Sequence, residues 1–187
     1  MSIEWINRGL NLWTIEEGTQ AITAGTATYS FPAGTIDFLD QVIRTDAGET
    51  NNQADTSVTR ISPMSYSQLP NKLQKGKPLQ IYIQRMTSPQ YTLWPVPDDA
   101  QTYTLVYWRI RRIQDVGTAG TNTYDAPDRW LPALTAGLAY YVSMKRPETA
   151  QRTQLLKAVY DEQFMYAADE DRVKASIQLV PGGYGWL

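Results

Sequence analysis

The first residues of the chain place apolar side chains at the three- and four-residue spacing of a helix face. This pattern predicts a helix from Ser2 to Trp13, and Gly18 is expected to close the segment because glycine often ends helices. The apolar positions on the shared face are Ile3, Ile6, Leu10 and Trp13. A helix this short needs a packing partner to be stable.

The pattern changes to alternation from Thr19 to Ile113, where turn residues separate the runs. A period of two is typical of strands with one buried face. The clearest run begins at Tyr103 and continues to the end of this region, with Tyr103, Leu105 and Tyr107 on one face. The proline-containing stretch 95–101 predicts a β-hairpin, and the polar stretch 45–59 predicts an exposed loop or hairpin tip.

A short helix is expected near residues 62–71, within the strand region. Ser62 is suited to cap the first turn and Pro63 to occupy the first helical position, while Pro70 marks the stop.

Helical spacing returns in the last third of the chain. Residues 128–144 and 149–175 predict two helices, and Pro147 between them breaks the chain, so the two should form a helical hairpin. The first of these helices carries large apolar side chains on one side: Leu131, Leu134, Leu138, Tyr141 and Val142. It also has small residues that permit close approach of a neighbour, and we expect it to be buried on more than one face.

These elements predict an α+β fold in which the two ends of the chain meet. Residues 1–18 and 126–175 are expected to form one helical bundle, and residues 19–125 an antiparallel β-rich extension. Residues 176–187 follow as an extended C-terminal tail.

Composition places limits on the partners of this chain. It has 187 residues, of which 19% are charged, below the roughly 25% of an average soluble domain, so part of the surface is expected to meet other protein. The 17 basic side chains are balanced by 19 acidic ones, which argues against sequence-specific DNA binding. No apolar run approaches membrane-spanning length and no secretory signal is evident, so we expect a soluble, unexported protein with no membrane partner.

The absence of cysteine and histidine restricts the available chemistry. It removes thiolate nucleophiles, the commonest general base and the commonest metal ligand, so we expect no enzyme, no catalytic residues, no metal site and no cofactor. Carboxylates stand together at Glu16 and Glu17, at Asp98 and Asp99, and from Asp169 to Asp171, but their spacing matches no known ligand set. They are interpreted as solvated turns and helix faces.

Two basic groupings lie in the strand region: Arg109, Arg111 and Arg112, and upstream of them Lys72, Lys75 and Lys77. The three arginines are candidates for contacts with phosphates or with another subunit, since nonspecific charge suffices to face phosphates. The favoured interpretation is an edge strand protected by positive charge. Alternation places Arg109 and Arg111 on one face and Arg112 elsewhere.

The last twelve residues are apolar but interrupted by glycine, which suits neither a helix nor a solvated tail. Such a segment is explained if it becomes ordered on a partner, so we expect docking on another protein subunit. The candidate docking residues are Leu179, Val180, Tyr184, Trp186 and Leu187. The polar loop 46–59 is a second candidate contact, with simple tolerance of a polar loop as its alternative.

The order and spacing of several segments carry a family resemblance over essentially the whole chain. They are WTIEEGT at 13–19, KGKPLQIY at 75–82, LWPVPDDA at 93–100 and YDAPDRWLPAL at 124–134. The chain resembles the head-to-tail adaptor (tail tubular protein A-like, or head-completion) proteins of short-tailed bacteriophages.

The resemblance implies a virion structural protein at the head-tail junction, assembled in the host cytoplasm. It implies a homo-oligomeric ring of twelve copies under the portal, joined to tail nozzle or tail fibre proteins. The ring would help retain packaged double-stranded DNA, which lies in nonspecific proximity to it. The resemblance adds the portal as a candidate partner of the C-terminal docking residues, the tail side as that of the polar loop, and a DNA channel as that of the three arginines. Two other functions remain as alternatives: a neck or tail-completion protein of a long-tailed phage, and a carboxylate-dependent cell-wall glycosidase, which needs two facing acids.

Overall fold

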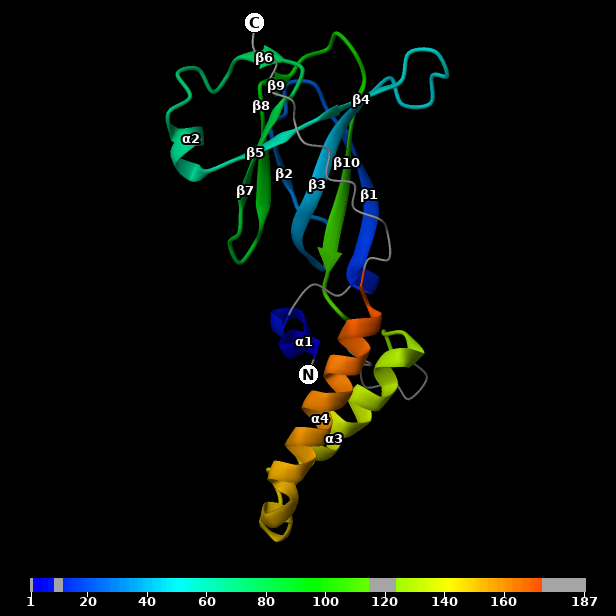
Figure 1. Ribbon diagram of the computed structural model, residues 1–187. Coiled ribbons are helices and arrows are strands. Elements are labelled where there is room, and N and C mark those ends of the chain that lie inside the picture. The colour runs from blue at the N-terminus through cyan, green and yellow to red at the C-terminus, as the bar shows by residue number, and fades with distance from the viewer. Residues whose placement is uncertain (1, 9–11, 115–123, 173–187) are drawn as a thin grey trace, which may run out of the picture. The chain divides into compact units, whose positions relative to one another are not determined.

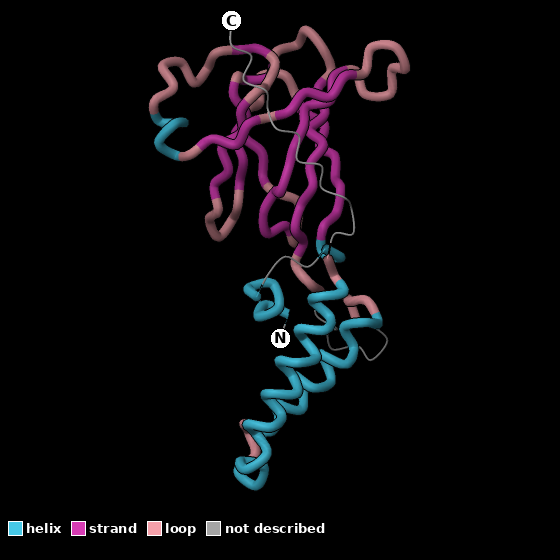
Figure 2. The backbone as a smooth tube through the Cα atoms, in the orientation of Figure 1, coloured by secondary structure: helices cyan, strands magenta, loops and turns pink. Residues whose placement is uncertain are grey.

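The computed structural model describes residues 2–8, 12–114 and 124–172, and these fall into two compact units. A strand unit contains helix α1 and the strands, and a helical unit contains residues 12–13 and the chain from 126 onward (Figure 1). Figure 2 shows the same division by secondary structure, with the long helices confined to the C-terminal part.

The first sheet of the strand unit has four antiparallel strands in the order β1-β10-β3-β4. Its members are β1 (Ile15–Ile22), β10 (Tyr103–Arg111), β3 (Thr35–Thr45) and β4 (Ala54–Ser57). Strands β3 and β4 form a hairpin, which confirms that the polar stretch between them is a hairpin tip.

The second sheet has the order β2-β8-β7-β5 and is mixed, because β5 runs parallel to β7. Its members are β2 (Thr28–Ser30), β8 (Gln90–Trp94), β7 (Gln80–Gln84) and β5 (Thr59–Ile61). A small parallel pair consists of β6 (Lys75–Gly76) and β9 (Val96–Pro97). The prediction of a purely antiparallel region is therefore wrong in these two pairings.

The core of the strand unit is formed by side chains from both four-stranded sheets. Its buried members are Phe31, Phe38, Ile43, Val58, Ile81, Ile83, Tyr91, Leu93, Tyr103, Leu105 and Tyr107. Tyr103, Leu105 and Tyr107 of β10 all contribute to it, which confirms that these three alternating positions share one face of the strand. Phe38 stacks between Phe31 and Tyr107, with ring centroids 4.4 Å apart in each case.

The predicted hairpin at 95–101 is wrong. Strand β8 pairs with β2 and β7, whereas β10 pairs with β1 and β3, so the connecting segment passes from one sheet to the other. The physical reason is that Leu93 and Tyr103 both point into the shared core from opposite sheets. Proline-containing turns look alike in sequence whether they join paired strands or two layers.

The helical unit is built on a hairpin of α3 (Leu131–Ser143) and α4 (Ala150–Glu170), as expected from the C-terminal pattern. The turns η2 (Asp128–Trp130) and η3 (Pro147–Thr149) precede the two helices. Its aromatic centre is Trp130, which is fully buried and contacts Trp13 and Phe164, with centroids 6.3 and 5.4 Å away.

The predicted bundle of the N-terminal helix with the C-terminal hairpin is wrong. Helix α1 (Ser2–Arg8) groups with the strands, where Trp5 is 1% exposed. Trp13 instead lies in a separate turn, η1 (Leu12–Thr14), and contacts the helical unit. The apolar stripe read as one helix face is divided between two units, which a periodicity count over a short segment does not reveal.

Gly18 does not end a helix either, because it lies within β1 opposite Tyr107. A Cβ atom added at Gly18 would stand 2.6 Å from atoms of the Tyr107 ring, closer than any tolerated contact. Glycine is required here by the close approach of a buried aromatic side chain.

The short helix α2 (Pro63–Ser67) begins as the sequence indicates. Ser62 is its N-cap and accepts a hydrogen bond from the Ser65 backbone N–H at 3.0 Å, and Pro63 occupies the first turn. The cap satisfies one of the N–H groups that a helix start leaves unpaired.

Candidate functional site

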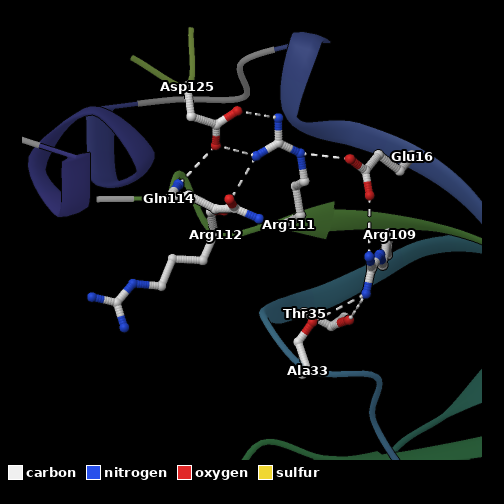
Figure 3. Close-up of polar contacts among 8 residues, drawn as sticks. All are labelled: Glu16, Ala33, Thr35, Arg109, Arg111, Arg112, Gln114 and Asp125. Atoms are coloured by element: carbon white, nitrogen blue, oxygen red, sulfur yellow. Dashed lines mark hydrogen bonds and ion pairs between the residues drawn. The ribbon is translucent and has the colours of Figure 1, made fainter. Parts of the chain in front are cut away.

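The three candidate arginines lie at the end of β10, where the strand twists out of regular pairing with β3 (Figure 3). Register shifts occur between Trp108 and Arg109 and between Ile110 and Arg111. Strand β10 is flanked by β1 and β3, so it is a central strand. The interpretation of these arginines as protection for an edge strand is therefore wrong.

Arg109 is held by groups from both neighbouring strand segments. Its Nη2 atom lies 3.1 Å from Glu16 Oε2, and its Nη1 donates to Thr35 Oγ1 at 2.9 Å and to the Ala33 carbonyl at 3.3 Å. The guanidinium group thereby joins β1 to the start of β3.

Arg111 makes the densest contacts of the cluster. Its Nε lies 2.6 Å from Glu16 Oε1, and its two terminal nitrogens donate to Asp125 at 2.5 and 2.9 Å in a bidentate pair. The Gln114 backbone N–H also donates to Asp125, at 2.8 Å. The hydrogen bonds from Arg111, and then that from Gln114, hold the pKa of Asp125 below its usual range.

Arg112 is oriented differently. Its backbone N–H donates to the Gly34 carbonyl at 2.7 Å, and its exposed side chain points away from the Glu16 and Asp125 carboxylates in Figure 3. The structure therefore confirms that Arg109 and Arg111 share one side of the strand end and that Arg112 does not.

The three arginines and the two carboxylates line a pocket of about 570 Å³. Its other lining residues are Ala33, Gly34, Ile113 and Gln114. Glu16 and Asp125 balance two of the three guanidinium groups. A glycosidase acid needs a raised pKa, whereas the pKa of Asp125 is lowered, so this carboxylate is unsuited to donate a proton. The arrangement is suited to holding chain segments together or to a weak contact with an anionic group.

The upstream lysines do not join this cluster in the contacts observed. Lys72 donates to the Ser67 and Leu69 carbonyls and lies over the Tyr66 ring, and Lys77 donates to Thr56 at 2.6 Å. The two basic groupings in the sequence thus serve different local structures.

A second candidate surface lies on α3. The small residues Ala133 and Gly137 are buried, and on the same side Tyr140 and Ser143 contact α4 through Tyr160 and Thr153. The small residues permit the close approach that the sequence predicts. The expected burial on a second face is not seen among the described residues, where the large apolar side chains Leu131, Leu138 and Val142 remain exposed.

Asp171 has a structural role that the sequence does not predict, because it stands among carboxylates interpreted as solvated. It is 7% exposed, accepts a hydrogen bond from the Leu12 backbone N–H at 2.8 Å and pairs with Arg129. It thereby ties the end of α4 to η2 and to the segment before β1. No local signal distinguishes it from its exposed neighbour Asp169, because its partners are distant in sequence.

The five candidate docking residues of the tail lie outside the described residues. Within the described part of the chain, no group of three or more suitable side chains could hold a metal ion. No helix there is both long and apolar enough to cross a membrane.

Comparison with protein families gives a match to the SU10 adaptor protein model over residues 1–180. The chain belongs to the SU10 adaptor family. This is a head-tail adaptor family of bacteriophages, which confirms the resemblance at the level of adaptor proteins. A comparison with curated proteins found no match.

As an SU10 adaptor, the chain is a structural component of a phage virion that assembles with other virion proteins. The matched residues include both the strand unit and the helical hairpin, and with them both candidate surfaces.

Proposed function

We propose that this SU10 adaptor forms a ring under the portal, joins the portal to the tail and helps retain packaged DNA at the head-tail junction. The observation that carries the proposal is the family match along nearly the whole chain. We further propose that the ring has twelve copies and contacts tail nozzle or tail fibre proteins on its far side. Assembly is proposed to take place in the host cytoplasm, and the chain is proposed to be related to tail tubular protein A-like adaptors. Its mechanism is binding, without catalysis.

The exposed apolar side chains of the helical hairpin support an assembly function. Most of the large apolar side chains that are exposed lie on α3, α4 or their connection, and monomeric proteins rarely leave such surface open. On a symmetric template, each weak contact is repeated around the ring, so the total affinity grows by avidity.

The decisive experiment is to add the purified protein to purified portal and image the complexes by electron microscopy. The proposal expects a closed ring on the tail-facing side of the portal, with a copy number given directly by its symmetry. Binding of single copies without a ring, or attachment only to tail proteins, would contradict it.

The tail is proposed to attach the assembled ring, through Leu179, Val180, Tyr184, Trp186 and Leu187, to the portal or to a neighbouring subunit. Removal of residues 176–187 should abolish attachment while the strand unit still unfolds cooperatively. Normal attachment of the truncated chain would show that the contact lies elsewhere.

The arginine cluster is proposed to contact the DNA channel or another subunit. Arg109 and Arg111 form ion pairs with carboxylates, and the Arg112 side chain is exposed, so a charge reversal at Arg112 tests the contact while those ion pairs stay in place. Arg112→Glu should increase loss of packaged DNA, or weaken ring formation, relative to Arg85→Glu. Arg85 is a suitable control because its side chain is 60% exposed and its ion pair with Asp37 is long, at 3.6 Å. Equal DNA retention and equal ring formation by the two variants would remove the cluster from the proposal.

A further inference from the structure

Helix α3 combines an exposed position with a sequence that lacks charge. None of its thirteen residues is acidic or basic, yet Leu131, Leu138 and Val142 are 52%, 58% and 47% exposed. A helix with a solvent-facing side normally carries charged or polar residues there, and one that is apolar all round is normally buried. The composition of α3 therefore indicates that another segment covers it.

The three exposed side chains lie along one strip of the helix surface, which also includes the exposed Thr135 between Leu131 and Leu138. Their spacings of seven and four residues place them within a narrow sector of the helix, on the side opposite Ala133 and Gly137, which face α4. At 1.5 Å of rise per residue, the strip from Leu131 to Val142 is about 17 Å long. We call Leu131, Leu138 and Val142 the outer face of α3.

Helix α4 provides the contrast that makes this observation informative. Its exposed apolar residues, such as Leu155, stand among charged ones, including Arg152 and Lys157, and Tyr166 donates a hydrogen bond to Glu162 at 2.8 Å. That pattern is typical of a solvated helix. The outer face of α3 has no such neighbours within its own helix.

The described chain ends at the same end of the hairpin at which α3 begins. Asp171, which follows α4, pairs with Arg129, and Arg129 precedes Leu131 by two residues. The Leu12 backbone N–H donates to the same carboxylate at 2.8 Å, so the end of α4 is fixed there from two directions. The segment that follows Asp171 is therefore tethered at the end of the hairpin where the outer face begins.

The sequence that follows has the composition of a covering segment. Residues 173–187 read VKASIQLVPGGYGWL and contain a single charged side chain, Lys174. Fifteen residues can span up to about 50 Å when extended, far more than the strip requires. Their apolar side chains match a charge-free surface, and a tether to the same chain gives an intramolecular contact a high effective concentration.

We infer that in the free subunit residues 173–187 cover the outer face of α3 of their own chain. This contact shields apolar surface in both partners before assembly. It concerns the isolated chain, so it stands or fails independently of the ring and of portal attachment.

The absence of cysteine from the chain permits a direct test by disulfide trapping in the full-length protein. Leu138→Cys and Leu179→Cys are introduced together, and the matched control combines Leu155→Cys with Leu179→Cys. Leu155 is 62% exposed on α4, so its thiol is as accessible as one at Leu138. Dilute protein is oxidised and then cleaved at a site between the two cysteines. A disulfide within one chain holds the two fragments together at the mass of one chain, whereas a disulfide between chains gives a larger product.

The inference expects the Leu138→Cys pair to close within one chain at least about tenfold faster than the control pair. Equal rates for the two pairs would overturn it. Bonds that form only between chains would also overturn it, because they would show that a second copy occupies the outer face.

Hydrogen exchange of the otherwise unaltered chain gives an independent measurement. Leu138→Glu places a charge on the outer face and should raise amide exchange across 173–187 several-fold, whereas Leu155→Glu should leave it unchanged. Exchange at the free-peptide rate in the unaltered protein, or an equal response to both substitutions, would contradict the inference.

Discussion

The strand unit and the helical unit handle their apolar side chains in different ways. The strand unit encloses them between two sheets, with Ile43, Ile81, Leu93 and Leu105 all inaccessible to solvent. The helical unit has a small aromatic centre around Trp130 and leaves large apolar residues of both helices exposed. The strand unit therefore has the larger enclosed core, although it too exposes some large apolar side chains, such as Leu73 at 82%.

The same contrast appears in the polar contacts. In the strand unit, Arg111 and Asp125 join segments that already lie in one sheet or next to it. In the helical unit, Arg129 and Asp171 join the beginning and the end of the hairpin. Four substitutions compare the two units, from the largest expected effect to the smallest.

Truncation of a core side chain should separate the two units most clearly. Leu105→Ala should lower the free energy of unfolding by about 3 kcal/mol, because it leaves a cavity in a fully buried site. Leu155→Ala, at a side chain 62% exposed on α4, should cost less than about 0.5 kcal/mol. Urea unfolding of both variants measures the difference, and a similar loss in each would contradict the comparison.

A methyl group added at Gly18 should destabilise the strand unit next most. Gly18→Ala places a Cβ 2.6 Å from the Tyr107 ring, which is held by its stack on Phe38, so we expect a loss of about 2 kcal/mol. At Gly76 the nearest atom to an added Cβ is 3.6 Å away, an ordinary contact. Gly76→Ala should therefore change the urea midpoint much less, and equal midpoints for the two variants would argue against a steric role of Gly18.

Asp171→Asn tests the tie at the base of the helical hairpin. The amide still accepts from the Leu12 N–H but loses the ion pair with Arg129, so we expect the helical unit to lose about 1 to 2 kcal/mol. Tryptophan fluorescence, to which buried Trp130 contributes, reports the change. The control Asp169→Asn removes an exposed pair with Arg172 and should have almost no effect.

The Arg111 contact with Asp125 predicts a small acid sensitivity of the strand unit. Because the pKa of Asp125 is lower in the folded than in the unfolded chain, its contribution is complete above the unfolded value of about 4. The contribution is lost as pH falls through the folded pKa. The free energy of unfolding of the unaltered protein should therefore fall with pH in that acidic range, and Asp125→Asn should make this fall smaller by less than about 1 kcal/mol. The same pH dependence in both proteins would show that the pair adds no net stability.

The local elements were largely predictable from the chain. The inward face of β10, the Ser62 cap and the C-terminal helical hairpin follow from short-range periodicity and from side chains that bond to nearby backbone. The candidate site was predictable only in part. The opposite orientation of Arg112 follows from strand alternation, but the partners Glu16 and Asp125 come from distant segments and could not be named.

The sequence alone determined the class of elements, the lack of histidine and cysteine chemistry, and the adaptor resemblance, because each depends on residue type and on spacing over a few positions. Only the tertiary structure decided that Trp5 and Trp13 serve different units, that β10 is a central strand, and that α3 turns its small residues inward. The physical reason is that the hydrophobic effect favours burial of an apolar side chain but does not select the residues that bury it. Which face is covered depends on the segments that reach it.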